Sequence, residues 1–321
     1  MAAPDPTTAP PEREPSARRV VAGVSLSGPD LRYAEVVHEG GAARLRRLGV
    51  LDFAFDVERA VLGDGAPDAL SEVAEALGEV LGGTEASVLV VAAHPTTTTT
   101  FFTPLPAGIS DEARDAQIRQ ETALLADLAP DLAVRVRAVP VRSESGPGGG
   151  RRWYHVVHAA EPVHVRLSLL ADALGVPAYD LADTTRAVAA LADRPAPDNG
   201  DSAAGGAEAP VEVVVGAYAA HTEVALCQGG AFLFGHSGAG TTPEDTAYFA
   251  LSALQHAGLD AAAAGRLRTY GTAADADRLA LAADLLGRDL EPLDPFAAFG
   301  RSPDVSDAER AAFAPVLGGL L

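Results

Sequence analysis

The strongest constraint on the fold is a strand pattern that occurs twice, at widely separated places in the chain. The first copy has strands at Arg19–Gly23, Leu31–Glu39 and Arg44–Phe53, joined by a Ser-Gly-Pro-Asp turn and by Gly40–Gly41. Short β-branched and apolar runs joined by tight turns of this kind are typical of an antiparallel meander.

The second copy repeats this plan nearly two hundred residues later. Its strands are expected at Val211–Val215, Thr222–Cys227 and Ala231–Gly235, with turns at Gly216–Ala220 and Gly229–Gly230. Each meander is followed by helical and strand patterns. An internal duplication follows, which predicts an α/β protein with one meander opening each of two lobes.

Composition divides the chain at two places. Residues 1–18 are rich in Pro, Thr, Ala and Glu and predict a disordered leader. Residues 193–209, rich in Pro, Gly, Asp and Ala, predict a linker between the lobes. The first lobe is therefore expected at residues 19–192 and the second at residues 210–321.

Charge and residue usage exclude several classes of protein. The net charge of −20 and the pI near 4.7 disfavour binding to nucleic acid, whose affinity depends on basic side chains that neutralise phosphates. Every basic residue other than histidine is arginine, so a Walker-type phosphate loop and a Schiff-base lysine are both excluded. With a single cysteine, Cys227, and no export signal or long apolar stretch, the chain is expected to be cytoplasmic.

Two other patterns resemble a metal site and a catalytic serine, but neither meets the requirements of such a site. His155, His158 and His164 could suggest a metal site, but a spacing of three places the first two on opposite faces of a strand. Ser237 lies in the sequence GHSGAG, which lacks the last glycine of a nucleophile elbow. We therefore predict no metal ligand and no catalytic residue.

The order of segments from about Val20 to Leu321 resembles the actin-like ATPase superfamily. Within it, the chain is most similar to the PilM-type pilus assembly proteins and to the related cytoplasmic part of the type II secretion L protein. The resemblance implies a small α+β subdomain inserted in the first lobe, at about residues 94–160. Four segments carry it, in the family's order: Leu105-Pro106, Gln120–Ala123, Val134–Val141 and Trp153–Ala159.

The resemblance also implies a nucleotide site between the lobes, where the turn of each meander wraps the phosphates of ATP with Mg²⁺. Glycines allow backbone N–H groups to approach phosphate oxygens, and an aspartate in each turn holds the metal ion or orients water. In the first turn, Gly23 matches the first glycine, Ser25 replaces the aspartate and Ser27 replaces the next glycine. Gly28 follows, and Arg32 stands in place of the family's lysine.

The second turn departs further from the pattern. Gly216 replaces the aspartate and Tyr218 replaces a glycine, while Thr222 matches a family threonine and Gly271 with Thr272 is what remains of a glycine pair. Without either aspartate, we expect a degenerate site, no bound cofactor and a pseudo-ATPase scaffold. The alternative is an active ATPase or sugar-kinase-like enzyme, in which hydroxyl and amide groups of the turns and one arginine would hold ATP with Mg²⁺.

The partner implied by the resemblance is a PilN-like membrane protein, bound through its N-terminal cytoplasmic peptide. We expect the peptide in an apolar groove between the inserted subdomain and the first lobe, near Leu89–Leu105 and Ala133–Val141. A strand edge there could take it by strand addition. The chain would then be a cytoplasmic scaffold, peripheral to the inner membrane, of a type IV pilus or type II secretion assembly. A homo-oligomer is also possible.

Overall fold

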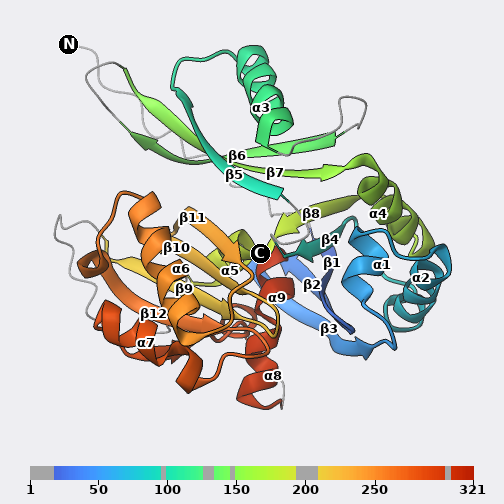
Figure 1. Cartoon of the computed structure of the whole chain (residues 1–321). Coiled ribbons are helices and arrows are strands. Elements are labelled where there is room, and N and C mark those ends of the chain that lie inside the picture. The colour runs from blue at the N-terminus through green and yellow to red at the C-terminus, as the bar shows by residue number, and fades with distance from the viewer. Residues whose placement is uncertain (1–17, 95–98, 126–133, 145–148, 193–208, 301–304) are drawn as a thin grey trace, which may run out of the picture.

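A computed structural model describes residues 18–94, 99–125, 134–144, 149–192, 209–300 and 305–321. Nearly all of the predicted leader and linker lies outside these residues. Figure 1 shows two lobes, each built on one sheet, and a smaller third sheet placed above both. No helix in the described part of the chain is both long enough and apolar enough to span a membrane.

The first lobe is built on a five-stranded sheet with the order β3-β2-β1-β4-β8. Its antiparallel meander is continued by parallel strands. The strands are β1 (Arg19–Ser27), β2 (Asp30–Glu39), β3 (Ala42–Asp52), β4 (Leu89–Ala93) and β8 (Tyr179–Asp183). The helices on its outer face are α1 (Val57–Leu62), α2 (Pro67–Leu81) and α4 (Glu161–Ala173). Leu26, Leu77 and Leu167 are fully buried between this sheet and these helices.

The second lobe repeats that arrangement. Its sheet has the order β11-β10-β9-β12-β13, and again the strands after the meander pair in parallel. The strands are β9 (Val211–Ala217), β10 (Thr222–Gln228), β11 (Ala231–Gly238), β12 (Ala264–Tyr270) and β13 (Leu290–Pro292). The helices are α6 (Pro243–His256), α7 (Ala276–Leu286) and the short η1 (Ala261–Ala263) and η2 (Ala297–Phe299). The duplicated α/β architecture predicted from the two meanders is confirmed.

The meander strands are longer than the sequence pattern predicted. β1 continues past Gly23 to Ser27, because Val24 and Leu26 are fully buried and keep the chain extended. β9 likewise continues through Gly216 to Ala217. Ser25 and Gly216, expected in turns, therefore lie within strands.

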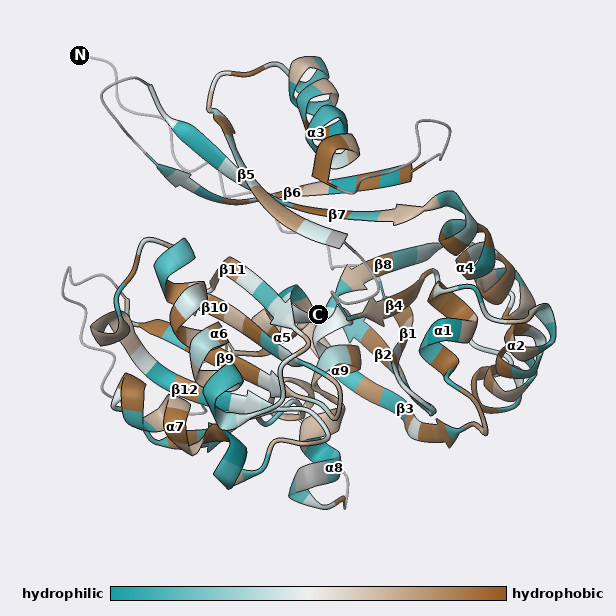
Figure 2. Cartoon of the chain, viewed as in Figure 1, coloured by the Kyte–Doolittle hydropathy of each residue, from teal (hydrophilic) through white to brown (hydrophobic). Residues whose placement is uncertain are grey.

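The inserted subdomain is a three-stranded antiparallel sheet of order β5-β7-β6 with one helix. Its elements are β5 (Thr99–Pro106), α3 (Asp111–Leu125), β6 (Val134–Glu144) and β7 (Arg151–Ala160), in the order the resemblance predicted. Ile118 of α3 packs on Leu105, Tyr154 and Val156 of the sheet. Figure 2 shows the rest of α3 coloured largely as hydrophilic, which fits a helix covering the outer face of a small sheet.

Three helices lie where the two lobes meet: α5 (Thr184–Ala192), α8 (Asp307–Ala312) and α9 (Ala314–Gly319). One apolar cluster joins Val21 and Val36 of the first lobe to Val214 and Ala225 of the second. Leu317 of α9 completes it. Asp183 caps the start of α5 by accepting hydrogen bonds from the backbone N–H groups of Thr185 and Arg186. The lobes are therefore joined by a continuous core.

The contact between α5 and α9 depends on one glycine. A Cβ added at Gly318 would collide with the backbone carbonyl of Ala187 on α5, whereas one added at Gly319 would touch only the side chain of Val90. Gly318→Ala is expected to lower the free energy of unfolding by about 1–3 kcal/mol, because overpacking forces the helices apart. Gly319→Ala is the matched control in the same helix. Urea unfolding of both variants checks this, and equal stability of the two would contradict it.

Candidate functional site

The residues predicted for the first nucleotide turn contact other residues of this chain. Gly23 packs directly against the side chain of Leu320, so a Cβ there would clash with it. Ser25 is buried in mid-strand opposite Arg32. Arg32, itself largely buried, donates to the Asp30 carboxylate at 3.1 Å. The expected phosphate charge is thus paired within its own hairpin.

Ser27 and Gly28 form the tip of that hairpin. Gly28 has φ +59, a left-handed conformation that glycine adopts without strain, and its carbonyl accepts a hydrogen bond from the Val57 N–H at 2.7 Å. The turn chemistry that the sequence predicted is present. The Gly28 carbonyl, however, already accepts a hydrogen bond from the first residue of α1.

The second-turn residues lie close together. The ring of Tyr270 covers Gly216, and Gly271, with φ +99, lies against the backbone of Ala217. The hydroxyl of Thr222 donates to the Gly240 carbonyl at 2.8 Å and accepts from Arg278 at 2.7 Å. Both hydrogen-bonding roles of the threonine are therefore filled from within the second lobe.

A buried carboxylate, Glu223, lies at the centre of the space between the lobes. It follows Thr222 on β10, and its side chain has no exposed surface. It accepts hydrogen bonds from Tyr270 Oη at 2.6 Å and from Thr184 Oγ1 at 2.8 Å. His94 Nδ1, at the end of β4, lies 2.6 Å from its Oε1, and His221 Nε2 lies 3.4 Å from the same oxygen. Glu223 of the second lobe thus binds His94 and Thr184 of the first.

Aromatic rings close the space around this carboxylate. The rings of His94, Tyr218 and His221 pack on one another with centroid distances of 4.5–4.8 Å, and all three are buried. Tyr218 is the residue that replaces a glycine of the second turn, and its buried hydroxyl has no hydrogen-bond partner among the described residues. Its ring fills the place that a glycine would leave open beside the hairpin.

The charges of the pair are set by burial and by one another. Burial opposes ionisation of Glu223, but the charge of His94 and the hydrogen bonds from both histidines outweigh it and lower the pKa of the carboxyl. Burial would also lower the pKa of His94, but the adjacent Glu223 carboxylate raises it above its usual value. Burial raises the pKa of Tyr218 and of Tyr270, with the Glu223 charge adding to it. Glu223 and His94 therefore form an ion pair between two neutral phenols.

His94, His221 and Glu223 also offer three potential metal ligands within 4.8 Å of one another. Zinc would be the natural ion for two imidazoles and a carboxylate, at about 2.0–2.2 Å from each, so tetrahedral ligand atoms would lie about 3.3 Å apart. The 2.6 Å between His94 Nδ1 and Glu223 Oε1 is instead a hydrogen-bond distance. The geometry fits a direct ion pair.

His155 and His158, which we set aside as metal ligands, are both buried in β7. His155 stacks on Phe102 of the neighbouring strand with centroids 4.8 Å apart, and its Nε2 lies 3.5 Å from Asp183 Oδ2. His158 faces Phe101, and burial lowers the pKa of its imidazole. The contact of His155 with Asp183 of β8 ties the inserted subdomain to the first lobe.

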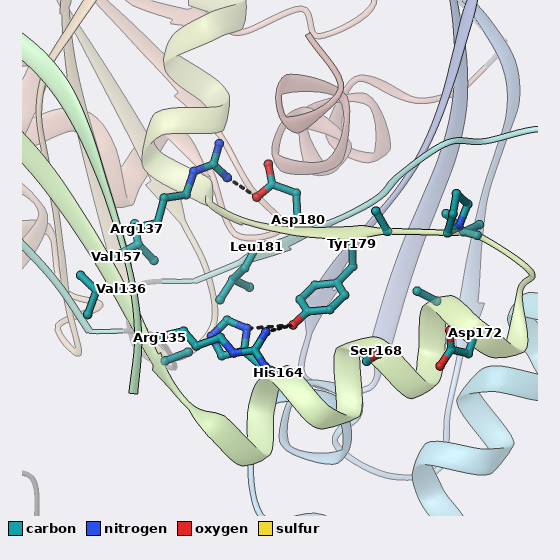
Figure 3. Close-up of a pocket in the computed structure, with 15 residues that line it drawn as sticks. Arg135, Val136, Arg137, Val157, His164, Ser168, Asp172, Tyr179, Asp180 and Leu181 are labelled. Carbon is teal, nitrogen blue, oxygen red and sulfur yellow. Dashed lines mark hydrogen bonds and ion pairs between the residues drawn. The ribbon is translucent and has the colours of Figure 1, made fainter. Parts of the chain in front are cut away.

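A groove separates the inserted sheet from the first lobe. It holds a cavity of about 390 Å³ lined by β6, β7, α4 and β8. Figure 3 shows the polar contacts at its edge: Arg137 with Asp180, and Arg135 and His164 with the hydroxyl of Tyr179. The rest of the lining is mixed, with apolar side chains such as Val136, Val157 and Leu181 and with the polar Ser168 and Asp172 of α4.

Both sheets present an end strand to this groove. β6 ends the three-stranded sheet and β8 ends the sheet of the first lobe, and each lines the cavity. An end strand carries backbone N–H and C=O groups along its outer edge that can pair with an added chain. The predicted segment 133–141 lies partly on the groove through Arg135–Arg137. The described residues of the other predicted segment, 89–94 and 99–105, do not line it.

The duplicated lobes, closed on a space between the two meanders, define the actin-like ATPase fold. No protein-family model and no curated protein matches the chain. A Bacteroides thetaiotaomicron protein with an actin-like ATPase fold and unknown function aligns over 86% of this chain and 91% of its own, with TM-score 0.52 and 10% identity.

A structure of the PilM-PilN type IV pilus biogenesis complex is more similar. It aligns over 94% of this chain and 97% of its own, with TM-score 0.64 and 16% identity. The cytoplasmic domain of EpsL, an inner-membrane component of the Vibrio cholerae type II secretion system, aligns at TM-score 0.44 and 11% identity over 93% of this chain and 94% of its own. The first two likenesses confirm the predicted fold.

Proposed function

We propose that the chain is a cytoplasmic scaffold of a type IV pilus or type II secretion assembly, peripheral to the inner membrane. In this role it binds the N-terminal cytoplasmic peptide of a PilN-like membrane protein. The observation that carries the proposal is the groove of Figure 3, a cavity of about 390 Å³ between two end strands. The likeness in fold to the PilM-PilN complex supports the choice of partner.

The shape of the groove suits an extended segment. A chain laid along β6 or β8 would pair its backbone with the strand edge and place alternate side chains in the cavity. The apolar part of the lining, including Val136, Val157 and Leu181, would take aliphatic side chains. Specificity would come from those pockets, and affinity from the main-chain hydrogen bonds.

We further propose that the nucleotide site is degenerate and that the chain is a pseudo-ATPase. The Glu223–His94 pair and the ring of Tyr218 occupy the space between the meander turns. A buried carboxylate there would repel phosphate oxygens, and the hydroxyl of Thr222 already has partners on both sides. An active ATPase or kinase-like enzyme of the same fold, with ATP and Mg²⁺ in this space, is the alternative.

Peptide binding can be tested by filling the groove. Ala178 is exposed and lines the cavity, so Ala178→Trp should block it without disturbing the core. A fluorescent peptide of the cytoplasmic N-terminus of a PilN-like membrane protein from the same organism is expected to bind the wild type. Its affinity for the variant should fall at least about tenfold, because the indole would take the place of a peptide side chain.

The matched control is Ala173→Trp, an exposed α4 position that does not line the cavity. It should bind the peptide as the wild type does. Fluorescence anisotropy measures all three proteins. Equal loss in both variants, or no binding to the wild type, would contradict the proposed peptide site.

A further inference from the structure

A second hollow, of about 290 Å³, lies further along β6. It is walled by three parts of the molecule: Val139–Val141 of β6, the α5 side chains Arg186 and Ala189, and the turn at Gly230–Phe232 between β10 and β11. The same end strand therefore lines both hollows, through residues 135–137 in one and 139–141 in the other. A chain following the edge of β6 would pass from the first to the second.

Arg186 gives this hollow its chemical character. Its guanidinium is partly buried, and within the part of the chain that the structure describes it makes no hydrogen bond and no ion pair. Burial, followed by repulsion from Arg137, lowers the pKa of Arg186. The two nearby carboxylates attract Arg186 only from a distance and neither forms an ion pair with it, because Asp180 pairs with Arg137 and Oδ1 of Asp183 accepts from Thr185. Oδ2 of Asp183 has no hydrogen-bond partner among the described residues. A partly desolvated cation without a carboxylate of its own gains strongly from an incoming anion.

The lack of a hydrogen-bond or ion-pair partner for its guanidinium distinguishes Arg186 from the other described arginines that are buried or partly buried. Each of those is paired with a carboxylate or a backbone carbonyl: Arg32, Arg47, Arg114, Arg142, Arg166, Arg268, Arg278, Arg288 and Arg310. The chain carries 44 acidic residues against 24 basic ones, so internal partners for a cation are plentiful. Among the described residues Arg186 has no such partner, which leaves its guanidinium able to bind an anion from outside the chain.

The local form of β6 indicates how a ligand enters. Pro140 has no N–H, and the register with β7 shifts between Pro140 and Arg142. Backbone pairing with an added strand would therefore stop before Pro140, and the next part of the ligand would be held by its side chain in the hollow. From Arg135 to Val141 the strand covers about 20 Å, which corresponds to a ligand of about seven residues.

We propose that the Arg186 hollow is a subsite for an acidic side chain of the peptide held in the groove. The ligand would carry one Asp or Glu, bound by Arg186, next to an aliphatic residue that packs on Val139, Ala189 and Phe232. This inference rests on the proposed peptide-binding function and adds to it the charge that the peptide must bear. It also fixes where along β6 that charge lies.

The test uses a library of random seven-residue peptides displayed on phage and selected on the full-length protein. The enriched sequences are expected to share one acidic position beside an aliphatic one. A synthetic peptide of that consensus should bind about ten- to a hundredfold more tightly than its analogue with Gln in place of the acid, as an ion-paired hydrogen bond would give.

Arg186→Met separates the subsite from the groove. It should fold as well as the wild type, since it removes a partly buried charge that lacks a partner, and it should bind the acidic and the Gln peptide equally. Arg119→Met, an exposed α3 position, makes the same change in net charge and should keep the preference for the acid.

The outcomes are distinguishable. Selected peptides without a fixed acidic position, or a preference for the acid that persists in Arg186→Met, would overturn the subsite and leave the groove in place. If no peptide is enriched at all, the proposed peptide-binding function fails together with the subsite.

Discussion

Replacing Glu223 by glutamine is expected to lower the free energy of unfolding by about 3–5 kcal/mol, the usual cost of removing one member of a buried ion pair. The amide keeps the shape of the side chain, and its single oxygen can still accept from either Tyr270 or Thr184, which bind different oxygens of Glu223. It cannot neutralise His94, which is almost fully buried and 2.6 Å away. The charged imidazole must then lose its proton or remain unpaired between the lobes.

Urea unfolding of the wild type and of Glu223→Gln measures this loss. Glu79→Gln is the matched control, because Glu79 is exposed on α2 and its replacement changes the net charge by the same amount. The control should lie within about 0.5 kcal/mol of the wild type. Equal stability of the two variants would show that the pair does not hold the lobes together.

The second prediction is that this loss depends on pH. In the wild type the pKa of His94 is raised by Glu223, so its contribution to stability is fully present below about pH 6.5 and is lost as the pH rises through the folded-state pKa. In Glu223→Gln the effect of burial is opposed only by the weaker attraction of the Glu58 and Asp183 carboxylates. The pKa of His94 then falls below its usual value, and the variant loses stability as the pH falls below about 6.5.

The difference in unfolding free energy between wild type and Glu223→Gln should therefore grow as the pH falls from about 9 to about 5, by up to about 1.4 kcal/mol per pH unit. Glu223 is ionised in the unfolded chain throughout this range. Burial also lowers the pKa of His158, His164 and His236, but these groups titrate in both proteins and cancel in the difference. Urea unfolding at three pH values measures it, and a constant difference would contradict the ion pair.

Much of the fold could be predicted from the sequence because its signals are local. Alternating apolar residues and the Gly40–Gly41 and Gly229–Gly230 turns define the two meanders, and all four of these glycines have positive φ. Strand ends were less predictable. Ser27 and Ala217 end their strands because buried neighbours prolong the extended backbone, which no turn signal reveals.

The polar centre between the lobes was missed because its members lie far apart in the sequence. His94 and Glu223 are 129 positions apart. The family pattern places an aspartate within each turn, whereas Glu223 comes just after the second turn. The sequence nevertheless carries a signal for both Glu223 and His94. Glu223 interrupts an apolar strand, and His94 directly follows the buried residues of β4. Both positions predict a buried polar side chain, and such side chains are normally hydrogen-bonded.

The eight residues predicted for the nucleotide cleft are placed by the structure around the two hairpins, but whether the cleft holds a nucleotide stays a prediction. They are Gly23, Ser25, Ser27, Gly28, Arg32, Gly216, Thr222 and Gly271. The loss of both aspartates of the family pattern, at Ser25 and Gly216, also stays a prediction about the site. The sequence could not indicate that an ion pair and Tyr218 fill the space, because that depends on how the lobes close.

We propose that this chain holds its lobes together with its own side chains, at the place where an actin-like ATPase would hold its nucleotide. The most direct test is isothermal titration calorimetry with Mg-ATP, supported by the melting temperature of the protein at millimolar Mg-ATP. We predict no saturable heat and no change in melting temperature beyond that given by Mg²⁺ alone. A ligand at a hundred times its Kd stabilises a protein by about 2.7 kcal/mol, so a saturable heat with a rise of several degrees would contradict the account.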